Sequence, residues 1–296
     1  MNGSLITAAL AGLGGMAGWG LADFLAKKTI DRVGEVTTLF WGQLVGLVPL
    51  LGIFAVTRTV PVLHRFDALW LVLFGIVSAL SYLSLYAGFA KGPVSFLSPV
   101  FSAHAALVVV LSAAFFGERI AGEQWVAIVI VVAGVIAIST TPGELGTTLR
   151  NTSAANIPGL AEVLSAAVAF AFWLVFLDRF IGVRDWVLFL IVIRATAAVT
   201  VAVYALATHE PLWIRGTDRS LMACVAAIGL CDVAAFSAVS YGFSATTHTS
   251  VVAVLSSTFS LPTLLLARLF LKERLGTSQK IAAGVILTGI ALVSLY

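Results

Sequence analysis

The side chains that could do chemistry in this sequence are few, and they stand inside long apolar stretches. Arg194, Asp232 and His104 each lie near the middle of such a stretch, and Asp23 lies near the end of another. If the stretches cross a membrane, each ionisable group costs about 2.5–3.5 kcal/mol on insertion scales and usually faces a cavity or a partner. These four residues are therefore the first candidates for contact with a ligand.

Each candidate has two interpretations. Arg194 could bind a carboxylate of a ligand and Asp232 an ammonium group, or the two could form a buried ion pair without a ligand. His104 could titrate near neutral pH and couple transport to protons, or it could donate one hydrogen bond to a neighbouring helix. Asp23 has Lys27 one helical turn beyond it, which favours an ion pair on the helix surface near the membrane interface.

Aromatic and hydroxyl side chains recur at helical spacing beside these groups. A pocket for a small organic solute has mostly apolar and aromatic walls and a few polar groups, so these faces predict a binding cavity. The alternative is that the aromatic residues anchor the protein at the membrane interface and the serines fill helix contacts. Trp19, Tyr82 and Trp173 favour the cavity because they stand well inside their stretches. The predicted substrate-binding residues are Trp19, Ser78, Tyr82, Tyr86, Ser98, Ser102, His104, Trp173, Arg194, Asp232, Phe236 and Ser257.

The elements that must position these side chains are membrane helices. Of the 296 residues, 60% are hydrophobic and 10% are charged, whereas a soluble domain carries roughly 25% charged residues. The mean hydropathy is +1.07. The net charge is +3, and the basic residues are scattered and form no basic stripe, which argues against a nucleic-acid partner.

Ten apolar runs are long enough, at about 20 residues each, to cross a bilayer as helices, and they lack the alternation of strands. The predicted spans are 4–26, 35–57, 67–90, 93–115, 122–140, 157–178, 185–207, 220–243, 248–270 and 277–296. The polar segment 141–156 reads as a linker between a first five-helix repeat, 1–140, and a second, 157–296.

The two halves resemble each other along their length. The segment FFGERIAGEQ, residues 115–124, is nearly repeated as LFLKERLGTSQ at 269–279, and Trp19 corresponds to Trp173. Because each half holds five spans, an odd number, the second half must enter the membrane inverted. The sequence thus predicts an all-α membrane protein of ten transmembrane helices in two inverted five-helix repeats.

Three features of the sequence resemble EamA-type members of the drug/metabolite transporter superfamily. They are the two repeats, the Trp-Gly pair of the first span, and the segment 98–138, SPVFSAHAALVVVLSAAFFGERIAGEQWVAIVIVVAGVIAI. The resemblance covers essentially the whole chain and is closest to bacterial amino-acid exporters, including those for aromatic amino acids. It implies a multi-pass protein of the bacterial cytoplasmic (inner) membrane. One departure is that Pro99 corresponds to Val254 while Pro262 lies further along, so the fourth and ninth spans are expected to bend at different places.

The predicted function is secondary export of small metabolites by alternating access around a midplane cavity, without cofactor, metal or catalytic residues. The expected partners are an amino acid or similar solute, the lipid bilayer and protons, and the protein is a monomer or a homodimer. A carrier of nucleosides, sugars or cationic drugs, an intramembrane enzyme, and a scaffold or receptor are the alternatives. The orientation stays open, because the distribution of basic residues and the family resemblance favour opposite sides.

Overall fold

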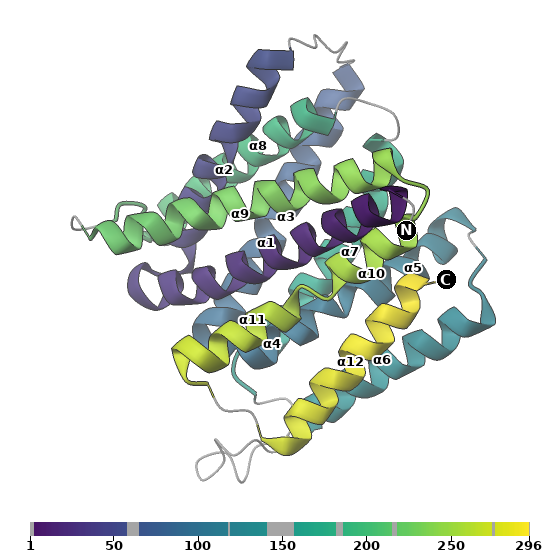
Figure 1. Cartoon of the computed structure of the whole chain (residues 1–296). Helices are drawn as coiled ribbons and strands as arrows, with labels where there is room; N and C mark the ends of the chain where they lie inside the picture. Colours follow the sequence, from purple (N-terminus) through teal and green to yellow (C-terminus); the bar gives the residue numbers. More distant parts are fainter. Residues whose placement is uncertain are drawn as a thin grey trace.

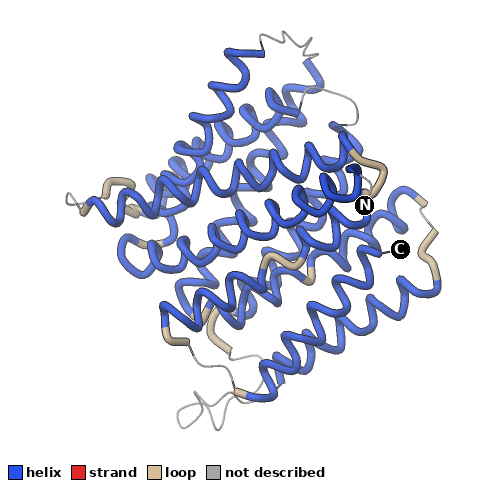
Figure 2. The backbone as a smooth tube through the Cα atoms, viewed as in Figure 1, coloured by secondary structure: helices blue, strands red, loops and turns tan. Residues whose placement is uncertain are grey.

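A computed structural model describes residues 3–57, 65–117, 119–140, 157–181, 186–214, 218–273 and 276–295. The described part consists of helices joined by turns and loops (Figures 1 and 2). The first half holds α1 (Gly3–Val33), α2 (Glu35–Thr57), α3 (Arg65–Lys91), α4 (Val94–Ser102), α5 (His104–Phe116) and α6 (Gly122–Thr140). The second half holds α7 (Leu160–Ile181), α8 (Trp186–Thr208), α9 (Arg219–Ala245), α10 (Thr249–Ser257), α11 (Ser260–Leu266), the π-helical turn η2 (Ala267–Leu271) and α12 (Thr277–Leu295).

Eight segments of the described part are long and apolar enough to cross a membrane, and Gly122–Ala137 and Lys280–Val293 are two shorter apolar helices. All ten fall on predicted spans, so the apolar helices and the all-helical class are confirmed. Ten crossings in an inverted arrangement remain a prediction. The predicted linker 141–156 lies outside the described residues, and the division into two repeat domains on either side of it also remains a prediction.

Helices of one half pack against helices of the other. The main pairs are α1 with α9, α3 with α7, α2 with α8, and α6 with α12, the last pair lying side by side in Figure 1. The largest group of buried apolar residues draws on both halves. The halves therefore share one core, and the side chains that line their contact come from both.

Glycines at matching positions allow the helices to approach closely. A Cβ on Gly134 of α6 would lie 3.0 Å from the backbone nitrogen of Ile286, and a Cβ on Gly289 of α12 would lie 2.9 Å from that of Val131. Gly289 follows Gly134 by 155 residues. Each glycine thus packs on the helix that carries the other, as expected when two equivalent helices cross at their small residues.

The fourth and ninth predicted spans are each interrupted, and the prediction that they bend at different places is wrong. The first break lies at Ala103, between α4 and α5, and the second lies at Thr258 and Phe259, between α10 and α11. Thr258 follows Ala103 by 155 residues, the spacing of the repeat. Pro99 and Pro262 therefore do not set the position of the break.

Local hydrogen bonds explain the breaks better. At the first break the Nδ1 atom of His104 lies 2.9 Å from the carbonyl oxygen of Phe101. At the second the hydroxyl of Thr258 donates to the carbonyl of Leu255 at 2.8 Å. Side chains that bond to nearby carbonyls compete with the regular helix ladder.

Candidate functional site

Aromatic rings from both halves meet in one continuous group, which we call the aromatic cluster. Its members come from α1, α3, α4, α5, α7, α9 and the break between α10 and α11, so no single helix hairpin forms it. They are Trp19, Tyr82, Tyr86, Phe101, His104, Phe170, Trp173, Phe236 and Phe259.

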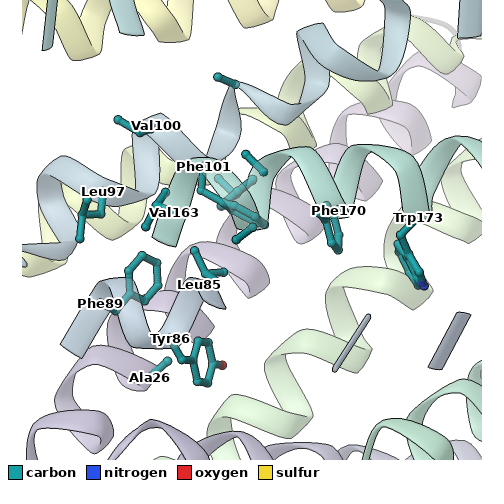
Figure 3. Packing of buried hydrophobic residues seen from close by; sticks show 14 of the residues in the cluster. Ala26, Leu85, Tyr86, Phe89, Leu97, Val100, Phe101, Val163, Phe170 and Trp173 are labelled. Atoms are coloured by element: carbon teal, nitrogen blue, oxygen red, sulfur yellow. The ribbon is translucent and has the colours of Figure 1, made fainter. Parts of the chain in front are cut away.

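Phe170 of α7 is the hub of this cluster. Its ring stacks on Trp173 with the ring centroids 5.1 Å apart, and it meets His104 edge to face at 4.9 Å. It also contacts Phe101 at 5.4 Å and Tyr82 at 5.9 Å. Figure 3 shows Phe170 and Trp173 pointing to the same side of α7. Three helices of the first half thus converge on one ring of the second.

Trp19 extends the cluster on the side of α1. It meets Phe236 of α9 at 5.3 Å and Phe259 at 6.2 Å, both in edge-to-face geometry. Phe259 in turn lies 6.4 Å from Phe101 and 6.5 Å from His104. These separations fall in the range at which aromatic pairs attract one another. Trp19 is therefore linked to the Phe170 hub through Phe259.

Trp173 is fixed by a hydrogen bond as well as by stacking. Its indole N–H donates to the carbonyl oxygen of Phe74 in α3 at 2.9 Å, and the residue is only 4% exposed. A buried indole N–H normally requires such a partner. The bond holds the ring in place between the halves, which limits how freely this face of the site can rearrange.

The two charged candidates of the second half neutralise each other. The Arg194 guanidinium in α8 forms an ion pair with Asp232 in α9 and donates a further hydrogen bond to Gln43 in α2 at 3.1 Å. Arg194 is 6% exposed. This arrangement matches the ion-pair interpretation given to the two residues from the sequence, since both charges are already satisfied inside the protein.

Asp23 makes a different contact from the one expected. The hydroxyl of Ser98 in α4 donates to its carboxylate at 2.9 Å, and Asp23 is 9% exposed. Lys27 instead bonds to Asp31 at 2.8 Å and to the carbonyl of Phe89 at 2.7 Å. The predicted Asp23–Lys27 surface pair is wrong, because a tertiary contact between α1 and α4 takes the carboxylate inward.

The remaining hydroxyl candidates are buried or bonded locally. Ser102 donates to the carbonyl of Ser98 at 3.1 Å, and Ser257 donates to that of Val254 at 3.0 Å. Ser78 is buried in α3, one turn before Tyr82. These three residues stand close in the sequence to members of the aromatic cluster and are not themselves members of it.

The comparisons with known proteins agree with this architecture. The profile of the EamA-like transporter family matches residues 6–140 and again 157–295. This chain belongs to the EamA-like transporter family. Membership indicates a membrane transporter of small solutes rather than an enzyme, built from two EamA repeats.

A solved structure shares the fold of this EamA transporter. It is described as "Crystal structure of protein", with a TM-score of 0.67 at 20% sequence identity, and the match covers 98% of this chain and 97% of the other. A comparison with curated proteins gave no match. The fold and family are thereby established, while the solute is not.

Three ring members of the EamA site were missed in the sequence prediction: Phe101, Phe170 and Phe259. Phe170 stands on the same helical face as Trp173, and this spacing could have identified it. Phe259 follows His104 by 155 residues, so the repeat itself pointed to it. Phe101 carries no comparable signal, because the position 155 residues later is Ser256.

One repeated motif of the EamA halves has a structural role outside the cluster. The carboxylate of Glu273 accepts hydrogen bonds from the backbone N–H groups of Ser95 at 2.9 Å and Val94 at 3.3 Å. A carboxylate at this position satisfies free donors at the start of α4. Its counterpart Glu118 lies outside the described residues. Within the described part, no three His, Cys, Asp or Glu residues are placed to hold a metal ion.

Proposed function

We propose that this EamA protein is a secondary transporter that moves small metabolites, specifically amino acids including aromatic ones, out of a bacterial cell across its inner membrane. The observation that carries the proposal is the aromatic cluster, to which both repeats contribute rings. Flat apolar rings with a few polar groups beside them are what a pocket for an aromatic amino acid needs. No cofactor enters the proposal, and it holds equally for a monomer and for a homodimer.

The cluster supports an alternating-access mechanism because its rings join helices of both halves. In this conformation neighbouring rings touch, with centroid separations of 4.9–6.5 Å within the group around Phe170 and Phe259. A solute would take the place of some of these contacts after the repeats rock apart. The helix breaks at Ala103 and at Thr258 lie beside the cluster, where a change of helix direction needs few backbone bonds to break.

Proton coupling remains a prediction, and His104 and Asp232 are the residues at which it is tested. His104 bonds to a backbone carbonyl and is packed among rings, and Asp232 is paired with Arg194. The test is whether a pH dependence of flux persists when both residues are neutralised. Persistence would remove these two residues as the coupling site and leave the transport proposal intact.

Counterflow in proteoliposomes tests the transport proposal directly. Vesicles containing the purified protein are loaded with an unlabelled amino acid, and entry of labelled tryptophan, phenylalanine, threonine or methionine is followed. Trp19→Ala and Tyr82→Ala are compared with Trp125→Ala, a matched control whose ring is 51% exposed on α6. We expect saturable exchange that the first two changes weaken and the control does not.

Two results would contradict the proposal. Folded wild-type protein that exchanges no amino acid would exclude this substrate class, and nucleosides, sugars and cationic drugs would be tested next. Equal exchange by all three variants would mean that the aromatic cluster is only a packing core. An outward direction is checked in cells, where loss of the protein should raise the internal amino-acid concentration.

A further inference from the structure

Three carboxyl groups, those of Asp23, Asp232 and Glu273, could meet a solute or stabilise the fold; Asp23 is buried and the other two are partly buried. They differ in their partners. Asp232 is paired with Arg194, and Glu273 accepts the backbone N–H groups at the start of α4. The partner of Asp23 within the described residues is the neutral hydroxyl of Ser98. Asp23 is therefore the one of the three whose negative charge is balanced neither by a cation nor by the free donors of a helix end.

The nearest cation on the same helix does not serve Asp23. Lys27 is bound to Asp31 and to the carbonyl of Phe89, at the end of α1 away from Trp19. Arg194 is engaged by Asp232 and Gln43. A buried carboxylate without an opposite charge is unfavourable in a membrane protein, so Asp23 either takes up a proton or binds a positive group.

The surroundings of Asp23 are those of a site for an organic cation. Trp19 stands one helical turn before it on α1 and belongs to the aromatic cluster. Tyr86 of α3, a helix that packs against α1, belongs to the same cluster through its contact with Tyr82, with the ring centroids 6.1 Å apart. Aromatic faces attract an ammonium group, and a carboxylate beside them supplies the opposite charge.

Asp23 also breaks the repeat. The position 154 residues later is Leu177, and the position 155 residues after Ser98 is Ala253. In this register the two matching positions are apolar, and Asp178 adjoins Leu177 in the sequence. A subsite for one end of an asymmetric solute is needed once, which agrees with a polar contact present in one half.

We infer that the Asp23 carboxylate, together with the Ser98 hydroxyl and the rings of Trp19 and Tyr86, binds the ammonium group of the transported solute. This inference rests on the proposed function and adds the recognition of one end of the substrate. It assigns to Asp23 the role that the sequence suggested for Asp232.

Competition experiments test the inference on the full-length protein. Counterflow of labelled phenylalanine is inhibited with phenylalanine, with phenylethylamine, which lacks the carboxylate, or with 3-phenylpropionate, which lacks the ammonium group. In wild-type protein the first two should inhibit and the third should be roughly tenfold weaker or more. Asp23→Asn should raise the inhibition constants of the two ammonium compounds by roughly tenfold and leave that of 3-phenylpropionate unchanged.

The matched control is Asp31→Asn, a carboxylate on the same helix that pairs with Lys27 and lies outside the cluster. It should behave as wild type. Ser98→Ala should shift the same two constants in the same direction as Asp23→Asn, by a smaller factor. If Asp23→Asn does not fold, the wild-type protein still gives an answer: phenylethylamine should raise its thermal unfolding midpoint, and 3-phenylpropionate should not.

The outcomes separate the two proposals. Unchanged constants in folded Asp23→Asn, or an equal effect of both compounds on the wild-type midpoint, overturn the ammonium subsite while amino-acid transport stands. An Asp23→Asn protein whose transport loses its pH dependence while its inhibition constants stay unchanged also overturns the subsite, because Asp23 would then bind a proton. Wild-type protein that exchanges phenylethylamine but no amino acid overturns the proposed function and keeps the subsite.

Discussion

The first and second repeats share some of their aromatic positions and differ in their charges. Trp19 and Trp173 stand at equivalent positions, as do Tyr82 and Phe236, each pair 154 residues apart. Arg194 and Asp232 of the second repeat, by contrast, correspond to Phe40 and Ser78 of the first. Part of the ring framework is thus repeated, although Tyr86 and Phe170 correspond to Ser240 and Met16.

The difference shows which features the symmetric scaffold needs. A fold made of two similar halves can be held together by packing that occurs twice, such as the crossing of α1 with α9 and the equivalent crossing of α7 with α3. A solute such as an amino acid has no such symmetry, because its two charged ends differ. Charges that occur once are therefore the features that can orient a solute, or that offset one another inside the protein.

The largest expected effect comes from replacing the arginine of the Arg194–Asp232 pair while the aspartate stays in place. Arg194→Phe, which installs the side chain of the matching position, strands the Asp232 carboxylate and the Gln43 amide. We expect the free energy of unfolding to fall by about 3–5 kcal/mol, the usual cost of one uncompensated buried charge. Thermal unfolding of the purified protein in detergent, followed by circular dichroism, measures the change.

The double variant Arg194→Phe with Asp232→Ser sharpens this test by rebuilding the pair of residues found in the first repeat. It should recover much of the lost stability, because no charge remains buried without a partner. A double variant as unstable as the sum of the single ones would show that the two residues act independently, and the ion pair would not be the reason for their burial.

A second, smaller effect concerns two glycines that match across the repeats. A Cβ on Gly229 of α9 would lie 2.7 Å from the carbonyl oxygen of Gly42, and a Cβ on Gly75 of α3 would lie 2.8 Å from that of Ile193. We expect Gly229→Ala and Gly75→Ala each to reduce the free energy of unfolding by about 1–3 kcal/mol, since each forces a helix pair apart.

Gly284→Ala is the matched control, because a Cβ there meets nothing within 4 Å. It should increase stability slightly, as alanine favours a helix over glycine by about 0.5–1 kcal/mol. Thermal midpoints of the three variants decide the matter. A decrease for Gly229→Ala with none for Gly75→Ala would show that the two crossings are not equivalent and would weaken the symmetric description.

Much of this arrangement is readable from the sequence, because membrane helices are specified by long apolar runs and the repeat by its spacing. The rings of Trp19, Tyr82 and Trp173 were found because they stand inside those runs at helical spacing. Such patterns are local, and a bilayer requires the backbone to form helices wherever the run is long enough.

The contacts between distant helices were not readable in this way. Lys27 stands one turn after Asp23, yet Asp31 stands one turn after Lys27, and helical spacing cannot choose between them. The choice is made by Ser98, which reaches Asp23 only once α1 and α4 have packed. The breaks at Ala103 and Thr258 were missed for a similar reason, since prolines nearby suggested other positions.

The third prediction separates two tryptophans that the repeat makes equivalent. Trp173→Phe removes the indole N–H that bonds to the carbonyl of Phe74. For Trp19, the described part of the structure shows contacts with the rings of Phe236 and Phe259 and no hydrogen bond. We expect Trp173→Phe to lower the free energy of unfolding by about 1 kcal/mol and Trp19→Phe to lower it by less. Counterflow should show the opposite order, with Trp19→Phe more affected if its ring faces the solute.

Those two measurements on the same pair of proteins test whether stability and transport are divided between the repeats. If Trp173→Phe unfolds at the wild-type midpoint, its hydrogen bond contributes nothing net. If both variants lose stability and transport in the same order, the two tryptophans share one role, and the asymmetry described for the site is confined to its charges.

The smallest expected effect lies at the exposed end of the crossing between α3 and α7, where Lys91 pairs with Glu162. The matching positions at the crossing of α9 and α1 are Ala245 and Ala8, so one crossing has an ion pair where the other has alanines. Glu162→Gln should lower the thermal midpoint only slightly, because exposed pairs contribute little. The difference from wild type should vanish at about 1 M salt, where the screening length is roughly 3 Å. A large decrease that persists in salt would show that this pair is shielded from solvent in the same way as Arg194 and Asp232. The buried and the exposed charges would then not differ in how they contribute to stability.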